Sequence, residues 1–191
     1  MKKIISLFLA VIMTVTMFAG CTVTEPEQTG GNDTAGETAL EVLQKVWGRF
    51  SDEEKFPVYG GDAENMVDGA PGQFSTTDTD GLMHNLLVPE NRLAEVDQAA
   101  SMIHGMMVNN FTCGVFRLKD GTDAASFADA MRTAFKENRW LCGTPEQLRV
   151  AVVGREYVIA AFGLGDVLDV FQSRLTQAYP NAQIKYAESI A

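Results

Sequence analysis

The chain has 191 residues, of which 15 are basic and 25 acidic, and 46% are hydrophobic. The resulting formal charge of −10 argues against binding nucleic acid, where affinity comes mainly from lysine and arginine on phosphates. It argues equally against attraction to anionic lipid by charge.

Residues 1–20 have the three parts of a secretory signal peptide. Lys2 and Lys3 supply the positive charge, residues 4–18 form an uncharged apolar run, and Ala19-Gly20 supplies small residues for cleavage. The apolar run is shorter than the roughly 20 residues that a membrane-spanning helix needs. Removing this segment leaves 13 basic and 25 acidic side chains, a formal charge of −12.

The sequence Phe18-Ala19-Gly20-Cys21 resembles the lipobox of bacterial lipoproteins, although an aliphatic residue is usual at the Phe18 position. In that class the cysteine thiol carries acyl chains and becomes the first residue after cleavage. The resemblance implies lipidation of Cys21 and attachment to the extracytoplasmic side of the cell membrane. The alternative is an ordinary signal peptide followed by an unrelated cysteine.

Residues 21–36 are rich in Thr, Glu, Pro, Gly and Asn and have almost no apolar side chains. Such a segment buries too little surface to offset its loss of conformational entropy. We therefore expect a flexible tether, followed by a head of residues 37–191 that is long enough for one domain with a hydrophobic core.

Residues 37–50 are expected to form a helix, because apolar side chains recur there at spacings of three and four. Thr34 and Glu37 have the spacing of a capping box. Residues 51–81 predict a long irregular connection with a short helix near residues 62–67. A short helix with proline in its first turn is expected at 89–96.

Residues 99–108 fit either a helix or a strand. Asn109-Asn110 is a plausible hairpin turn before the next strand, which favours a strand over residues 101–108.

The last eighty residues show clearer patterns. Strands are expected at 111–118, 148–153, 157–162 and 183–187, with helices at about 123–138 and 166–179. Thr122 or Asp123 is the expected cap of the first of these helices and Asp166 that of the second, and Lys185 suits an edge strand.

The predicted order β-α-β-β-α-β is that of a ferredoxin-like α+β core over residues 98–191, with residues 37–97 as an added N-terminal segment that includes a helix. Right-handed crossovers would place both helices on one face of the sheet. A strand before residue 111 would be an addition that competes with the C-terminal strand for one edge.

The stretch Asn110-Phe-Thr-Cys-Gly-Val-Phe-Arg-Leu-Lys-Asp-Gly121, and Gly154-Arg-Glu-Tyr-Val158 later, each precede an expected helix. These motifs resemble a domain-of-unknown-function family of small exported lipoproteins of mostly anaerobic Gram-positive bacteria. The resemblance covers about residues 85–180. It implies a lipid anchor and an α+β fold, and it carries no catalytic residue or cofactor.

Cys113 and Cys142 are an even pair in an exported chain, which permits a disulfide. Cys113 lies near the start of a strand and Cys142 just after the helix that follows, and this helix runs back toward the start of the strand. The alternative is two reduced cysteines packed as small apolar residues.

Methionine and histidine cluster around residues 83–107. If residues 101–108 form a strand, Met102, His104 and Met106 share one face, and thioether and imidazole groups together are ligands that suit copper. The alternative is core packing by methionine.

Asp78-x-Asp80-Gly81 resembles part of a calcium loop, but Thr76 and Leu87 stand where further ligands are needed. No nucleophile elbow, phosphate loop or zinc-ligand spacing is present. The leading hypothesis is a non-enzymatic lipoprotein that binds an envelope protein or a small ligand. A copper or thiol-redox protein is the alternative, and a hydrolase comes third.

Overall fold

A computed structural model describes residues 34, 36–141 and 143–190. The predicted signal peptide, Cys21 and most of the predicted tether lie outside these residues. Thr34, which was assigned to the tether, is buried. The helices are α1 (Ala39–Trp47), α2 (Thr79–His84), α3 (Ala124–Glu137) and α4 (Gly165–Ala178), and the 3-10 helices are η1 (Glu90–Glu95) and η2 (Val108–Asn110). The strands are β1 (Val58–Gly60), β2 (Val67–Asp68), β3 (Gly72–Phe74), β4 (Val96–His104), β5 (Phe111–Leu118), β6 (Gln147–Val153), β7 (Tyr157–Gly163) and β8 (Gln183–Ser189).

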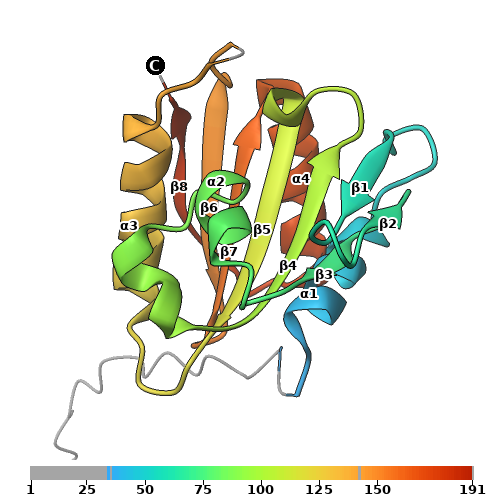
Figure 1. Cartoon of the computed structure of the whole chain (residues 1–191). Helices are drawn as coiled ribbons and strands as arrows, with labels where there is room; N and C mark the ends of the chain where they lie inside the picture. The colour runs from blue at the N-terminus through green and yellow to red at the C-terminus, as the bar shows by residue number, and fades with distance from the viewer. Residues whose placement is uncertain (1–33, 35, 142, 191) are drawn as a thin grey trace, which may run out of the picture.

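The strands form one sheet in the order β2-β1-β4-β5-β7-β6-β8, and β3 pairs with β4 beside β1. Every recorded pair is antiparallel, which makes the fold α+β. The long strands β4 to β7 fill the centre of the sheet in Figure 1. The chain enters at the lower end of that view, while the β4–β5 and α3–β6 connections lie at the upper end.

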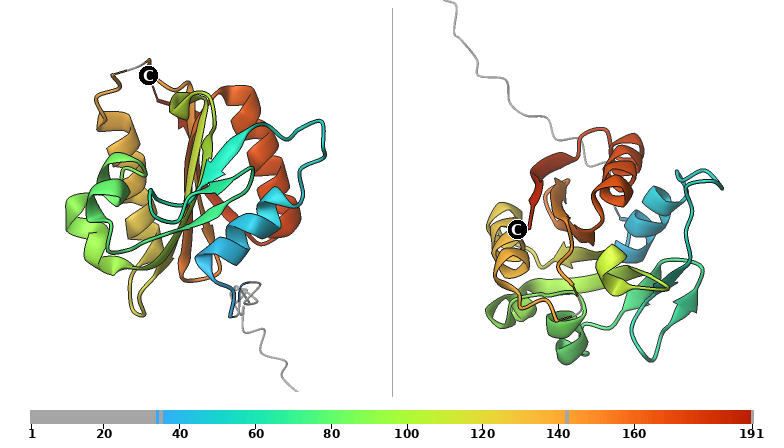
Figure 2. Two further views of the ribbon diagram at one scale, coloured as in Figure 1. Left: turned by 45° about the vertical axis from the view of Figure 1, so that its right-hand side comes forward. Right: turned by 90° about the horizontal axis from the view of Figure 1, so that it is seen from above.

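Helices cover both faces of this sheet, as the turned view in Figure 2 shows. Apolar side chains of α1 and α4 pack on one face, and those of α2 and α3 pack on the other. Successive side chains of a strand point to opposite faces, so a strand covered on both sides is apolar throughout. All seven residues of β7 are buried for this reason. By contrast, exposed and half-buried positions alternate along the edge strand β8.

The predicted order β-α-β-β-α-β is present from β5 to β8, but its ferredoxin-like pairing is not. In that plan the last strand would lie beside β5, whereas β4 occupies this edge and β8 pairs with β6. The connection through α3 leads from β5 to β6, and the connection through α4 leads from β7 to β8, so each passes over one strand in the direction of the β8 edge. The two connections start from β5 and β7, which are antiparallel neighbours. Right-handed connections with this geometry place α3 and α4 on opposite faces, so the expectation of a shared face was wrong.

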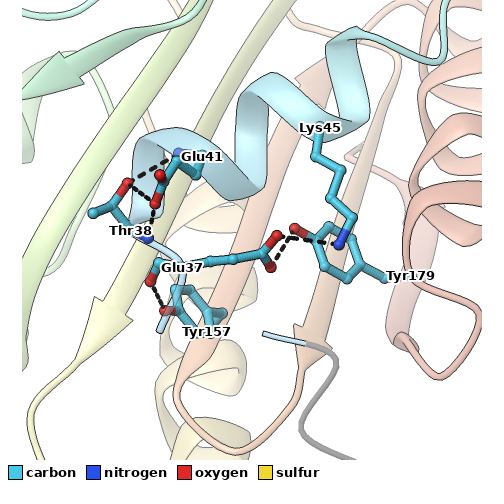
Figure 3. A network of polar contacts seen from close by, with 6 residues as sticks. All are labelled: Glu37, Thr38, Glu41, Lys45, Tyr157 and Tyr179. Carbon is cyan, nitrogen blue, oxygen red and sulfur yellow. Dashed lines mark hydrogen bonds and ion pairs between the residues drawn. The ribbon is translucent and has the colours of Figure 1, made fainter. Parts of the chain in front are cut away.

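The start of α1 is held by a polar network that Figure 3 shows. The Tyr157 hydroxyl donates to the Glu37 carbonyl, and the Tyr179 hydroxyl donates to Glu37 Oε2 at 2.9 Å. Lys45 Nζ lies 3.1 Å from Glu37 Oε1 and 4.4 Å from the centroid of the Tyr179 ring. Both tyrosines are buried, so the network fixes the point where the chain enters the head.

The capping box of α1 is formed by Thr38 and Glu41 rather than by Thr34 and Glu37. The Thr38 hydroxyl accepts from the Glu41 amide, and Glu41 Oε2 accepts from the Thr38 amide at 2.7 Å. This exchange satisfies backbone donors that the first turn of a helix leaves unpaired.

Three other local predictions needed correction. Residues 62–67 contain no helix, because Asp62 accepts hydrogen bonds from the amides of Glu64, Asn65 and Ser75 and organises a turn. The strand preferred for residues 101–108 is β4, which starts earlier and ends at His104, and Asn109-Asn110 lies in η2. Leu164 is the N-cap residue of α4, and Asp166 lies in the first turn.

Candidate functional site

A pocket of about 510 Å³ lies on the α2 and α3 side of the sheet. Two of the segments that line it, the β4–β5 connection and the chain after α3, lie at the upper end of the sheet in Figure 1. The floor of the pocket includes Ile103, Thr112 and Phe162. These three residues are cross-strand neighbours on β4, β5 and β7, so their side chains share one face. The register of the central strands therefore builds the floor.

Two segments form the walls of this pocket. One is the C-terminal end of α2 with the residues after it, and the other is the chain that follows α3. The wall residues are Met83, His84, Asn85 and Leu87 on one side, and Asn138, Arg139, Trp140 and Leu141 on the other. A volume of this size falls in the range of roughly 300–1,000 Å³ that is typical of small-molecule sites.

Phe162 is fixed by two aromatic neighbours. Its ring centroid lies 4.8 Å from that of Trp140 and 5.2 Å from that of Phe135, both in edge-to-face geometry. Such pairs stabilise by about 0.5–1.5 kcal/mol beyond the burial of their surfaces. Trp140 therefore anchors the chain after α3 against the pocket floor.

Leu87 has a backbone conformation that is rare for its residue type. Its φ of 57° places it in the left-handed region, and it is the only non-glycine residue with positive φ in the described part of the chain. This conformation costs a residue with a Cβ roughly 1–2 kcal/mol. Strained residues of this kind are often found at ligand sites, and Leu87 lines the pocket.

The rim of the pocket is apolar and exposed. Val108 and Leu141 line the pocket and are 55% and 92% exposed, and Met106 and Met107 lie exposed in the same β4–β5 connection. Asn109 Nδ2 donates to the Gly143 carbonyl and ties this connection to the chain after α3. Exposed apolar side chains that gather in one place are often found at ligand and partner surfaces.

Among the described residues that line the pocket, Thr112 carries the only hydroxyl group. The hydroxyl of Thr112 donates to the Val108 carbonyl at 2.9 Å and so serves the local fold. Among the described residues, no group of three or more His, Cys, Asp or Glu side chains could hold a metal ion. What the arrangement can do chemically is surround an apolar molecule and offer it amide, imidazole and guanidinium donors.

The three residues of the predicted copper site have different surroundings. Met102 is fully buried in the core under α1 and α4, while Met106 lies beyond the end of β4 and is 80% exposed. The His104 ring stacks on Phe56, with centroids 5.2 Å apart, and its Nδ1 accepts from the Met106 amide at 3.1 Å. Copper binding by this set stays a prediction, and these contacts give each residue a role in packing or in the turn.

Cys113 is a free, buried thiol among the described residues, and its bridge to Cys142 stays a prediction. Its side chain lies in the core on the α1 and α4 side of the sheet. The segment with Cys142 follows α3, which covers the opposite face, and Cys142 itself lies outside the described residues. Burial raises the pKa of the Cys113 thiol far above its usual range, which disfavours the reactive thiolate.

Sequence reasoning missed this pocket because four separate segments build it. The only local signal is Trp140-Leu141, two large apolar residues in a connection that is otherwise polar. No helix in the part of the chain that the structure describes is long and apolar enough to cross a membrane. No protein family, curated protein or solved structure matches the chain.

Proposed function

We propose that the protein is an exported lipoprotein, anchored through Cys21, whose head binds a small molecule without transforming it. The observation that carries the proposal is the apolar pocket of about 510 Å³ with its exposed rim. A binding site needs an apolar cavity with a few convergent polar groups, and this pocket has both. The acidic head keeps the protein soluble beside an anionic membrane surface.

The position of the pocket supports this reading. The network around Glu37 lies at the start of α1, where the chain enters the head. The β4–β5 connection and the chain after α3, which contribute to the pocket lining, lie at the opposite end of the sheet (Figure 1). An anchor at residue 21 would thus join the head at the end remote from the binding site. The pocket mouth can then face away from the membrane.

The anchor is tested by expressing the whole chain in a bacterium that processes lipoproteins. We expect the wild type to incorporate an alkyne-tagged fatty acid and to enter a detergent phase. Cys21→Ser should do neither, because the thiol is the acylated group. Equal labelling of the two chains would contradict the anchor.

Binding is tested by native mass spectrometry of protein isolated from the same membranes. We expect a small molecule to accompany the wild type and to be absent from the double variant Val108→Glu/Leu141→Glu, which places two charges on the rim. Both positions are exposed, so the substitutions should leave the fold intact.

Met66→Glu is the matched control, because Met66 is 67% exposed and lies next to β2, away from the pocket. It should retain the small molecule. The binding function is refuted if the rim variant retains the same molecule as the wild type, or if no molecule accompanies the wild type.

A further inference from the structure

The charge of the pocket lining differs from that of the chain. The whole sequence has 25 acidic and 15 basic side chains, yet none of the described residues that line the pocket carries a carboxylate. Its basic side chains are His84 and Arg139, at the mouth on opposite walls. A lining of this composition disfavours cationic ligands and favours a ligand with negative charge.

Arg139 is available to such a ligand. Most arginines of the chain pair with a carboxylate, namely Arg92, Arg117, Arg132, Arg149 and Arg174. Arg139 makes no ion pair with any residue that the structure describes, and it is exposed beside Trp140. A planar guanidinium presents several N–H donors that match the geometry of a carboxylate or sulfonate.

The interior of the pocket suits a different part of the ligand. The apolar surfaces of Ile103, Phe162, Trp140 and Leu87 offer contact to a ring system or an acyl chain. The amides of Asn85 and Asn138 are also among the wall residues and add neutral hydrogen-bonding groups.

Taken with the proposed binding function, on which this step rests, we infer that the ligand is an amphipathic organic anion. Its apolar body lies on the floor around Phe162, and its carboxylate or similar group lies at Arg139. A free aromatic acid and a fatty acid share this chemistry.

The test uses two dyes with the same ring system and the whole mature chain in detergent. The probes are 8-anilinonaphthalene-1-sulfonate, which carries one negative charge, and neutral N-phenyl-1-naphthylamine. We expect both to bind the wild type and neither to bind Val108→Glu/Leu141→Glu.

The substitution Arg139→Gln tests whether the site prefers a ligand with negative charge. The dissociation constant of the sulfonate dye should rise roughly twofold to fivefold, as expected for an exposed ion pair, while that of the neutral dye stays constant. Raising the ionic strength should remove the difference between the wild type and the variant, because salt screens exposed charges. Arg155→Gln is the matched control, since Arg155 is exposed in the turn between β6 and β7 at the other end of the sheet.

The outcomes separate the two proposals. If the rim variant blocks both dyes but Arg139→Gln affects them equally or not at all, the pocket binds ligands and the inferred anion is wrong. If the rim variant binds both dyes like the wild type, the binding function at this pocket is wrong as well. When the anion is confirmed, displacement by 2-naphthoate or by decanoate tells an aromatic body from an acyl chain.

Discussion

The hydroxyl of Tyr179 donates a hydrogen bond of 2.9 Å to Glu37 Oε2, and this contact joins the start of the folded head to the end of its last helix. Tyr179 is fully buried, and the carboxylate of Glu37 also contacts Lys45. The chain that leads from the proposed anchor is therefore fastened to the core by polar contacts and not only by apolar packing.

Tyr179→Phe should lower the free energy of unfolding by about 1–2 kcal/mol, because the charged acceptor loses its donor inside the protein. Denaturant unfolding measures the change. Tyr59→Phe is the control and should have almost no effect, since Tyr59 is 43% exposed. Equal effects of the two substitutions would show that the Glu37 contact adds nothing to stability.

The ion pair between Glu54 and Arg174 should make stability depend on acid pH. Glu54 Oε2 accepts from Arg174 Nε at 3.0 Å, and the Arg174 side chain lowers the pKa of Glu54 from 4.5 to about 2. A carboxylate whose pKa is lower in the folded than in the unfolded state stabilises the fold at pH values above its unfolded pKa. This contribution disappears as the pH falls from about 4.5 to 2.

Glu54→Gln should therefore be less stable than the wild type at neutral pH, and the two should converge as the pH falls through this window. Unfolding curves at a series of pH values measure the difference. Glu53→Gln is the neighbouring control, because Glu53 is exposed. A difference that stays constant down to the lowest pH would contradict the assignment to this carboxylate.

Leu87→Gly should leave stability within about 1 kcal/mol of the wild type, because relief of the left-handed strain offsets the loss of a half-buried side chain. Its neighbour provides the contrast: Leu86 is 2% exposed with no such strain, so Leu86→Ala should cost about 2–5 kcal/mol. If Leu87→Gly and Leu86→Ala lowered the free energy of unfolding equally, the backbone of Leu87 would not be strained. The glycine variant should also weaken dye binding, since Leu87 is part of the pocket wall.

The elements between residues 111 and 189 could be predicted because each has a local pattern. The strand expected at 111–118 agrees with β5, and Asp123, one of the two expected residues, caps α3. The partner of the last strand could not be predicted in this way. The alternating exposure along β8 suits an edge strand on either side of the sheet. The position of β8 depends on β4, which precedes the predicted β-α-β-β-α-β segment and occupies the free edge of β5.

The pocket could not be predicted from local sequence patterns either. Ile103, Thr112 and Phe162 are neighbours only because of strand register, and nothing in their local sequence marks them as a set. The methionine and histidine spacing is visible in the sequence, but it gives no information on burial. Met102 and Met106 differ from fully buried to 80% exposed although they are four residues apart.

This difference predicts separate effects for the two methionines. Met102→Ala should cost about 2–5 kcal/mol as a core truncation, whereas Met106→Ala should change stability by less than about 0.5 kcal/mol. Titration with Cu(I) against a competing chelator tests the metal hypothesis directly. A clear loss of affinity in His104→Ala would support the copper site, and an unchanged affinity would contradict it.

Cys113 should resist alkylation in the folded protein and react fully after unfolding without reductant. Burial keeps reagents away, and the raised pKa of the thiol leaves almost no thiolate at neutral pH. Peptide mapping after iodoacetamide treatment assigns the label to Cys113 and separates it from Cys21 and Cys142. If Cys113 stayed unlabelled in the unfolded, unreduced chain, a disulfide would have to hold it, and the face assigned to its side chain would be wrong. Complete labelling of Cys113 would instead show that no disulfide joins β5 to the segment after α3.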